Sequence, residues 1–330
     1  MKAQIIHQFG SPDVFTTTDI PTPELKPGHV LIEVKATSVN PIDCKIRSGA
    51  VANIAPDFPA ILHGDVAGII KEISADVTEF KIGDEVYGFA GGVKGRNGAL
   101  ADYMLADARL IAKKPNSFSF EQAAAMPVVA ITCWNALCDK AKLQANQMVL
   151  IHGGVGGVGH IAVQLAKALG AKVYATVSSE SDAELARSLG ADVAINFKTS
   201  TAEEYTQEYT NGVGFDVVFD TVGGDNLKNS FIAAKTEGIV VTTAARTTQD
   251  LTLLHNKALT LSVVFVLLPL LTNQGCEHHG ERLRKIAEFA NAGKIKPLID
   301  ARVFNFDEVS QAHQLLESGQ AKGKVVLVNR

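Results

Sequence analysis

Short apolar segments alternate with amphipathic segments from about residue 149 onward. The apolar runs have the length and composition of buried parallel strands, and two of the segments between them end at Gly170 and Gly190, a common helix stop signal. The expected strands are residues 149–151, 172–177, 193–196, 215–220, 238–242 and 259–266, and the expected helices are residues 160–169, 182–189 and 201–210. This succession predicts an α/β fold with a doubly wound parallel sheet.

The first third of the chain has a different pattern, in which short strands are separated by Gly and Pro turn signals. The expected strands are residues 30–36, 66–73 and 84–89, with one or two more within 100–111. Such a succession is typical of a small β-barrel. A helix is expected from Phe120, capped by Ser119, interrupted by Pro127 and continued over 129–141.

The end of the chain is predicted to contain two helices and one strand. Two amphipathic helices, 281–292 and 307–316, precede a final apolar strand at 324–328. We expect that strand to join the sheet of the first domain, which makes this domain discontinuous. The predicted division is residues 1–122 for the first part of the β-rich domain, 123–268 for the domain with the parallel sheet, and 269–330 for the segment that returns to the β-rich domain.

Composition narrows the range of partners and compartments. The chain has 330 residues, a formal net charge of -4 and no basic stripe, so nucleic acid is not expected as a partner. The most apolar run, residues 259–271, is too short to span a bilayer and is expected to be a buried strand. The first residues lack the apolar core of a signal peptide, and the four cysteines form no C-x-x-C pair. We therefore expect a cytoplasmic protein.

A glycine-rich turn lies between the first strand and the first helix of the predicted sheet. Gly154, Gly156 and Gly159 have the spacing G-x-G-x-x-G, and Gly157 and Val158 lie within the motif. In a dinucleotide site the first glycine allows the tight turn, the second lets the backbone approach a pyrophosphate, and the third lets helix and strand pack closely. The alternative is a glycine-rich turn without a ligand, but the strand–turn–helix context favours dinucleotide binding.

Further motifs are spread along the whole chain. They are Lys26-Pro27-Gly28-His29-Val30-Leu31, Asn40-Pro41-Ile42-Asp43-Cys44-Lys45, His63-Gly64-Asp65-Val66-Ala67-Gly68, Gly98-Ala99-Leu100-Ala101-Asp102-Tyr103, Thr132-Cys133-Trp134-Asn135-Ala136-Leu137, the glycine-rich turn with Ala162-Val163-Gln164-Leu165-Ala166-Lys167, and Gly323-Lys324-Val325-Val326-Leu327. Together they resemble the motifs of medium-chain dehydrogenases/reductases, in the zinc-independent branch of quinone oxidoreductases and enone (alkenal) reductases. The resemblance implies a GroES-like β-barrel domain for the substrate, a Rossmann domain that holds NADPH, and an active site between them.

The resemblance also bears on zinc. In the zinc alcohol dehydrogenases of the superfamily, the catalytic metal is held at positions that correspond here to Asn40, Gly64, Asp65 and Val128. An amide, a glycine and an aliphatic side chain do not replace thiolate and imidazole ligands, so we expect no metal. A rival metal set of Cys44, His63 and Asp65 lacks paired ligand spacing, and His63 is expected to be a hydrogen-bonded scaffold residue.

Without a Lewis acid, the expected chemistry is hydride transfer to a substrate that already accepts electrons, such as a quinone or an α,β-unsaturated carbonyl. By the resemblance, Lys45 and Asn40 are the candidate catalytic residues. The Lys45 ammonium is expected to bind the cofactor ribose or to stabilise an enolate, and the alternative is a solvated surface lysine. Residues 40–45 are expected to leave a strand and enter an irregular loop. Asn40 is expected near the nicotinamide, and Asp43 is expected to orient the loop.

Further cofactor contacts follow from the resemblance. The expected residues are Thr132, Thr221, Val222, Phe265, Val266, Lys322 and Gly323. Ser178 lies 24 residues after Gly154, near the spacing of about 20 at which a ribose-binding acid is found in NAD sites. Ser178 and Ser179 can donate to a 2′-phosphate, so we expect NADPH in preference to NADH.

Two positions depart from the pattern of NADPH-dependent relatives. Phe197 stands where a phosphate-binding Tyr is common, and Asp182 stands where some relatives have Lys. Lys198 or Arg187 is expected to supply the positive charge instead.

Three alternatives and one further expectation remain. The chain could be a zinc-free alcohol reductase, an enoyl-thioester reductase, or a non-catalytic NADPH-binding protein comparable to lens crystallins of the family. Residues 259–266 are an apolar candidate edge strand, and pairing of this strand with its two-fold copy predicts a homodimer.

Overall fold

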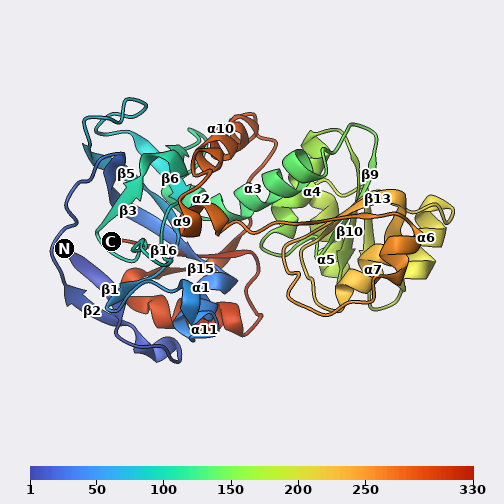
Figure 1. The fold of residues 1–330 in the computed structure, drawn as a ribbon, viewed down its shortest axis with the longest axis horizontal. Helices are drawn as coiled ribbons and strands as arrows, with labels where there is room; N and C mark the ends of the chain where they lie inside the picture. The colour runs from blue at the N-terminus through green and yellow to red at the C-terminus, as the bar shows by residue number, and fades with distance from the viewer. The chain divides into compact units, whose positions relative to one another are not determined.

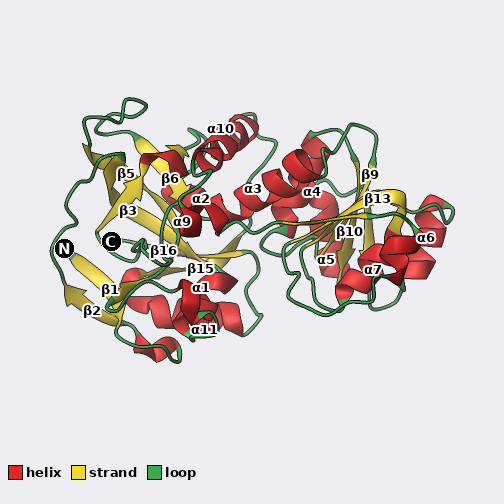
Figure 2. Ribbon diagram, in the orientation of Figure 1, coloured by secondary structure: helices red, strands yellow, loops and turns green.

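The computed structural model describes residues 1–330, which form two compact units (Figure 1). Unit 1 comprises Met1–Val128 and Val266–Arg330, and unit 2 comprises Val129–Phe265. Strands and helices occur in both units (Figure 2). No helix has both the length and the apolar character that are needed to cross a lipid bilayer.

Unit 2 contains a six-stranded sheet in which all neighbouring strands are parallel. Its strands are β9 (Met148–His152), β10 (Lys172–Val177), β11 (Val193–Asn196), β12 (Phe215–Asp220), β13 (Ala234–Thr242) and β14 (Thr260–Val263). The spatial order β11-β10-β9-β12-β13-β14 is the order 3-2-1-4-5-6 of a Rossmann sheet. The predicted doubly wound sheet is therefore confirmed.

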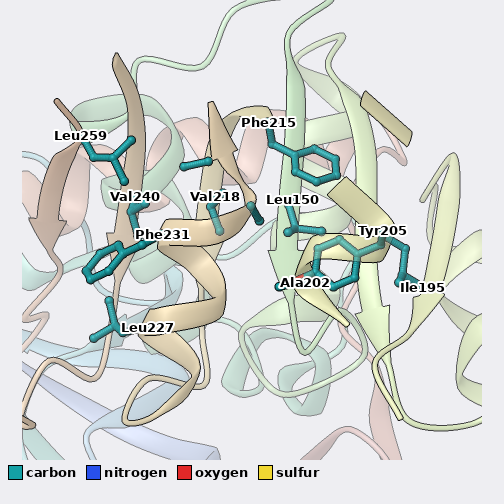
Figure 3. Packing of buried hydrophobic residues seen from close by; sticks show 12 residues of the cluster. Leu150, Ile195, Ala202, Tyr205, Phe215, Val218, Leu227, Phe231, Val240 and Leu259 are labelled. Carbon is teal, nitrogen blue, oxygen red and sulfur yellow. The ribbon is translucent and has the colours of Figure 1, made fainter. Parts of the chain in front are cut away.

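Helices follow the strands as the alternating pattern predicts. They are α4 (Gly159–Ala168), α5 (Glu180–Ser188), α6 (Ala202–Thr210), α7 (Asn226–Ala233) and α8 (Thr252–Asn256). In Figure 3, Tyr205 of α6 and Phe231 of α7 lie with Leu150, Val218 and Val240 of the sheet in one apolar cluster. Each such fully buried side chain contributes roughly 1.5–3 kcal/mol, which holds the strand ends in place for the site.

Unit 1 is built on a seven-stranded, mainly antiparallel sheet and a separate sheet β2-β1-β4. Its strands are β1 (Lys2–Ile6), β2 (Thr16–Asp19), β3 (His29–Val39), β4 (Ala60–Ile61), β5 (Asp65–Ile73), β6 (Glu85–Phe89), β7 (Tyr103–Asp107), β8 (Ile111–Lys113), β15 (Ile299–Asn305) and β16 (Lys324–Val328). Strand β16 pairs antiparallel with β3, so the final strand returns to the sheet of the first residues as predicted.

The helices of unit 1 include two long ones near the end of the chain. The helices are α1 (Pro41–Arg47), α2 (Phe120–Ala124), α9 (Leu268–Thr272), α10 (Glu277–Asn291) and α11 (Val309–Glu317), with 3-10 turns at Pro12–Val14, Ala52–Ile54, Ala108–Leu110 and Phe306–Glu308. The predicted helices 281–292 and 307–316 correspond to α10 and α11.

The helix that begins at Phe120 ends at Ala124, before Pro127, so the expected interruption is present. A second helix, α3 (Pro127–Trp134), begins at this proline, and a π-helical segment, Asn135–Lys140, follows. Two other local expectations were wrong. The apolar run 259–271 is not one strand, since β14 ends at Val263 and α9 begins at Leu268. Residues 40–45 do not form an irregular loop, because α1 begins at Pro41.

Candidate active site

The glycine-rich turn of unit 2 is shaped by close contacts at two of its glycines. A Cβ added at Gly159 would lie 1.9 Å from the carbonyl oxygen of Gly153, and one at Gly154 would lie 2.6 Å from the Ala175 Cβ of β10. Gly156 and Gly157 are exposed, and a Cβ at Gly157 would meet no atom within 4 Å. The turn is therefore tight against the sheet and open on its outer side, as pyrophosphate binding requires.

Hydrogen bonds from neighbouring strand ends hold this turn in place. The Gly153 amide donates to Thr176 Oγ1 at 3.0 Å, and the Gly154 amide donates to the Thr176 carbonyl at 3.0 Å. The Thr221 hydroxyl donates to the carbonyl of His152 at 2.6 Å. The ends of β9, β10 and β12 are thus joined beside the point where the strand order reverses, which is where ligands of open α/β sheets bind.

Burial keeps His152 neutral at the base of the turn. Its side chain is 3% exposed, and desolvation lowers its pKa to about 4, against a smaller opposing effect of the Asp220 charge. The Asp220 carboxylate itself accepts hydrogen bonds from the amides of Val222 and Gly223 at 2.9 and 2.8 Å. These bonds bend the chain after β12 and leave the Val222 side chain 57% exposed.

Two further predicted contacts of unit 2 lie near its ends. Thr132 is buried on α3, and the next residue, Cys133, donates its thiol hydrogen to the Val158 carbonyl of the glycine-rich turn at 3.3 Å. This places α3 against the turn. Phe265 follows β14 and is 42% exposed. Val266 is the first residue of the returning segment of unit 1.

The predicted 2′-phosphate residues lie at the end of β10 and around α5. Ser178 donates its hydroxyl hydrogen to Asp182 Oδ2 at 2.7 Å, and Ser179 Oγ accepts the Asp182 amide at 3.2 Å as the N-cap of α5. Phe197 and Lys198 are exposed after β11. The contact between Asp182 and Ser178 was not predicted, although the two residues are only four positions apart in the sequence.

In unit 1, Asn40 and Lys45 lie on one short helix. Asn40 is the N-cap of α1, and its amide donates to Asp43 Oδ2 at 2.7 Å, as in a capping box. Burial raises the Asp43 pKa to about 7, although the Asn40 hydrogen bond opposes this change. Lys45 is exposed on the same helix, while its neighbours Cys44 and Ile46 are buried.

A buried polar cluster surrounds the Asn40 side chain, and its centre is Asp65. The Asp65 carboxylate accepts the Ser38 hydroxyl at 2.6 Å, Asn40 Nδ2 at 2.8 Å and the Val128 amide at 2.9 Å. Lys324 Nζ lies 3.6 Å from the same carboxylate and donates to Asn40 Oδ1. Burial lowers the pKa of Lys324, and the adjacent carboxylates counteract this change.

Three members of this cluster, Asn40, Asp65 and Val128, are among the four positions that the resemblance matched to zinc ligands. Lys324 was not among the residues that the sequence identified for the site. A lysine that begins a strand otherwise made of Val and Leu was the available signal, because a charge in such a strand needs a buried partner.

A second buried group links α1 to α11. The Nε2 atoms of His63 and His313 are 2.9 Å apart, so one donates and the other accepts, and His313 Nδ1 lies 3.4 Å from Cys44 Sγ. Burial lowers the pKa of both histidines, so the pair is neutral at pH 7. His63 is thus a hydrogen-bonded residue of the scaffold. No group of three His, Cys, Asp or Glu side chains is arranged to hold a metal ion.

The last two predicted contacts precede β16. The Lys322 amide donates to Asp300 Oδ2 at 2.8 Å, and the Lys322 side chain is exposed. Gly323 has a φ of 101°, and a Cβ there would lie 2.4 Å from the Leu298 carbonyl oxygen. Only glycine fits this position without a backbone shift.

The chain matches known proteins along its whole length. Residues 26–116 match the alcohol dehydrogenase GroES-like domain, and residues 189–327 match the zinc-binding dehydrogenase model. The chain is 35% identical over 335 residues to 2-methylene-furan-3-one reductase of Solanum lycopersicum, covering 99% of this chain and 79% of the relative. It is 33% identical over 337 residues to an NADPH-dependent alkenal/one oxidoreductase of Arabidopsis thaliana, with the same coverage.

A solved structure supports the same relationship. The fold superimposes on Escherichia coli quinone oxidoreductase complexed with NADPH with a TM-score of 0.86 and 28% sequence identity, covering 99% of this chain and 100% of the other.

Proposed function

Since the chain belongs to the medium-chain dehydrogenase/reductase family, in the branch of quinone oxidoreductases and enone reductases, we propose that it is an NADPH-dependent reductase of quinones or α,β-unsaturated carbonyls that works without zinc. The observation that carries the proposal is the glycine-rich turn of unit 2, which is tight against the sheet and open on its outer side; unit 1 separately carries the exposed Lys45 on the helix that Asn40 caps. When bound, NADPH supplies the hydride.

The residues around the turn fit the cofactor. The exposed backbone of Gly156 and Gly157 and the first amides of α4 bind the pyrophosphate, since a helix N-terminus attracts anions. Val158 belongs to the same turn, and Thr132 contacts the ribose or a phosphate. Thr221, Val222, Phe265 and Val266 contact the nicotinamide side. Ser178, Ser179, Phe197 and Lys198 surround the 2′-phosphate, and Lys322 and Gly323 approach the cofactor from the C-terminal segment.

Lys45 and Asn40 handle the charge that develops on the substrate. After hydride addition to an enone, negative charge collects on the carbonyl oxygen, and the Lys45 ammonium donates a hydrogen bond to it or to the nicotinamide ribose. Asn40 Oδ1 accepts from Lys324 and Nδ2 donates to Asp65, so the Asn40 amide cannot flip. Its remaining Nδ2 hydrogen can only donate, which suits an oxyanion.

The proposed absence of zinc has a chemical basis in the Asp65 cluster. An ammonium, an amide and a carboxylate already satisfy one another there, and the amide is a poor zinc ligand. Elemental analysis of protein purified without chelator is expected to give less than stoichiometric zinc; one zinc per chain would contradict the proposal.

We also propose a homodimer that pairs β14 with its two-fold copy. Strand β14 is hydrogen-bonded only to β13, and Val263 and Phe265 beside the free edge are 44% and 42% exposed. An unprotected apolar edge is an aggregation risk, which pairing removes. Light scattering at micromolar concentration is expected to give twice the chain mass, and a monomer would refute the dimer. None of the four cysteines forms a disulfide bond, which fits a reducing, cytoplasmic compartment.

The test of the proposed chemistry is the variant Lys45→Ala. Because the side chain is exposed, the variant is expected to melt like the wild type. Loss of one donor to an oxyanion should lower kcat with an enone by about 10²–10³-fold, and by less with a quinone, which accepts hydride more readily. The measurement is steady-state NADPH oxidation with a 2-alkenal and with 9,10-phenanthrenequinone.

Two control variants make the result specific. Lys81→Ala removes another exposed lysine of unit 1 and should leave kinetics unchanged, and Lys45→Arg should retain part of the activity. A raised KM for NADPH with unchanged kcat would assign Lys45 to the ribose alone. Wild-type kinetics of Lys45→Ala with both substrates would exclude Lys45 from the chemistry.

The alternatives are separated by the same substrate screen. Turnover of enoyl thioesters or simple carbonyls, but not of quinones and enones, would identify the thioester or alcohol reductase. NADPH binding without turnover of any of these would identify the non-catalytic, crystallin-like protein.

A further inference from the structure

The Asp182 carboxylate lies beside the serines that face the cofactor ribose in the proposed site. It accepts the Ser178 hydroxyl at 2.7 Å and its backbone amide is capped by Ser179 Oγ at 3.2 Å. The hydrogen bond from Ser178 is the main cause that lowers the pKa of Asp182, and the Lys198 charge makes a smaller contribution. Asp182 is therefore ionised at neutral pH. A fixed negative charge therefore lies where an NADPH-specific site normally carries positive charge.

The hydrogen-bond direction at Ser178 matters as much as the charge. A serine hydroxyl has one hydrogen, and Ser178 donates it to Asp182. Toward a ligand, Ser178 can then only accept. The 2′-hydroxyl of NADH can donate to it, whereas an ionised 2′-phosphate has no hydrogen to donate. Binding of NADPH requires the Ser178 hydroxyl to rotate away from Asp182 and give up a charge-assisted hydrogen bond.

The positive charge available near this position is limited. Arg187 Nη1 lies 3.1 Å from Glu180 Oε1, so it already has an anionic partner at the surface. Lys198 is exposed after β11, and it interacts electrostatically with Asp182. Lys198 must therefore balance the Asp182 charge and a 2′-phosphate together.

We infer that Asp182 is a cofactor-specificity residue, which weakens binding of the 2′-phosphate through its charge and its hold on Ser178 and thereby keeps NADH usable as an alternative to NADPH. This inference rests on the proposed dinucleotide site. It assigns different roles to neighbouring residues: the two serines tolerate a 2′-phosphate, whereas the Asp182 carboxylate behind them opposes its binding. The wild-type protein should accordingly bind NADPH and NADH with affinities that differ by less than about tenfold.

The decisive variant is Asp182→Asn, which keeps an acceptor for Ser178 and removes the charge. Because a unit charge close to a doubly charged phosphate is lost, the affinity for NADPH relative to NADH should rise by about tenfold. Calorimetric titration with adenosine 2′,5′-bisphosphate and with 5′-AMP isolates the effect, since these probes differ only in the 2′-phosphate. The ratio of the affinities for these two probes should rise in the same way, and measuring it needs no assay of turnover.

The matched control is Glu184→Gln, which removes an exposed carboxylate of the same helix, α5, without releasing Arg187 from Glu180. It should change the ratio by less than about twofold, because a solvated charge is screened. An unchanged ratio in Asp182→Asn, with both probes still bound, would overturn the inference and leave the proposed function intact. Failure of wild-type protein to bind either probe or NADPH would overturn both.

Discussion

Replacement of Gly159 by alanine is expected to abolish cofactor binding and to destabilise unit 2. The added Cβ would lie 1.9 Å from the Gly153 oxygen, 2.8 Å from the Gly153 carbonyl carbon and 3.0 Å from that of Gly154. These are backbone atoms, which cannot rotate away like a flexible side chain. The start of α4 must therefore move away from the turn, and that movement displaces the amides proposed to bind the pyrophosphate.

The magnitude follows from the cost of overpacking. Forced insertion of a methyl group into a packed site costs about 1–3 kcal/mol, and a contact with rigid backbone belongs at or above the upper end of this range. We expect the free energy of unfolding to fall by about 3 kcal/mol and NADPH affinity to fall by more than about 100-fold. Urea denaturation and calorimetric titration of the same preparation measure the two effects.

Gly157→Ala is the matched control, since it adds the same methyl group two residues earlier. No atom lies within 4 Å of the added Cβ, so stability should be unchanged or slightly higher through a less flexible unfolded chain. Wild-type stability and NADPH affinity in Gly159→Ala would show that the close approach of α4 to the turn is not needed. Equal destabilisation by both substitutions would show that the effect is not steric.

The sheet of unit 2 was predictable because buried parallel strands are continuous apolar runs. Residues 172–177, 193–196 and 215–220 were expected as strands, and β10, β11 and β12 have those bounds. Their order in the sheet was predicted only as a doubly wound type, since the pairing of β9 with β12 joins segments that are far apart in the sequence.

Short or polar elements were less accessible to sequence reasoning. Helix α7 (Asn226–Ala233) begins with polar residues, and its apolar face, with Leu227 and Phe231, contributes to a core whose other members come from distant strands. Helix α1 has seven residues, but Asn40 at the N-cap, Pro41 at the first position and Asp43 at the third form a recognisable start signal. That signal was outweighed by the expectation of an irregular loop.

The two polar groups of the candidate site differ in how far their contacts could be predicted from the sequence. Ser178 and Asp182 meet through a local turn, and the serine–acid spacing around the N-cap Ser179 is visible in the sequence. Asp65 and Lys324 lie in strands from opposite ends of the chain. No local pattern pairs them, because their proximity depends on β16 joining the sheet beside β3.

Loss of the buried ion pair between Lys324 and Asp65 is expected to be among the most damaging changes in unit 1. In Lys324→Met the Asp65 carboxylate keeps its bonds to Ser38, Asn40 and Val128 but loses its only ionic partner at 3.6 Å. Removal of one partner of a buried pair costs about 3–5 kcal/mol, because an uncompensated charge stays in the interior. The free energy of unfolding, measured in urea at pH 7, should fall by that amount.

A double-mutant cycle separates this charge effect from the loss of packing. Asp65→Asn alone leaves the Lys324 ammonium buried without a carboxylate partner at position 65 and should also lower the stability. The double variant, Lys324→Met with Asp65→Asn, removes both charges and keeps a side-chain oxygen at position 65 that accepts the Val128 amide. The double variant should therefore lose at least about 2 kcal/mol less than the sum of the single variants. Strict additivity would show that the two side chains contribute independently to stability. Lys324 also holds the Asn40 amide in place. The double variant should therefore be more stable than the sum of the single variants predicts, while its kcat stays low. The stability measurement reports the role of the pair in folding, and kcat reports its positioning of Asn40.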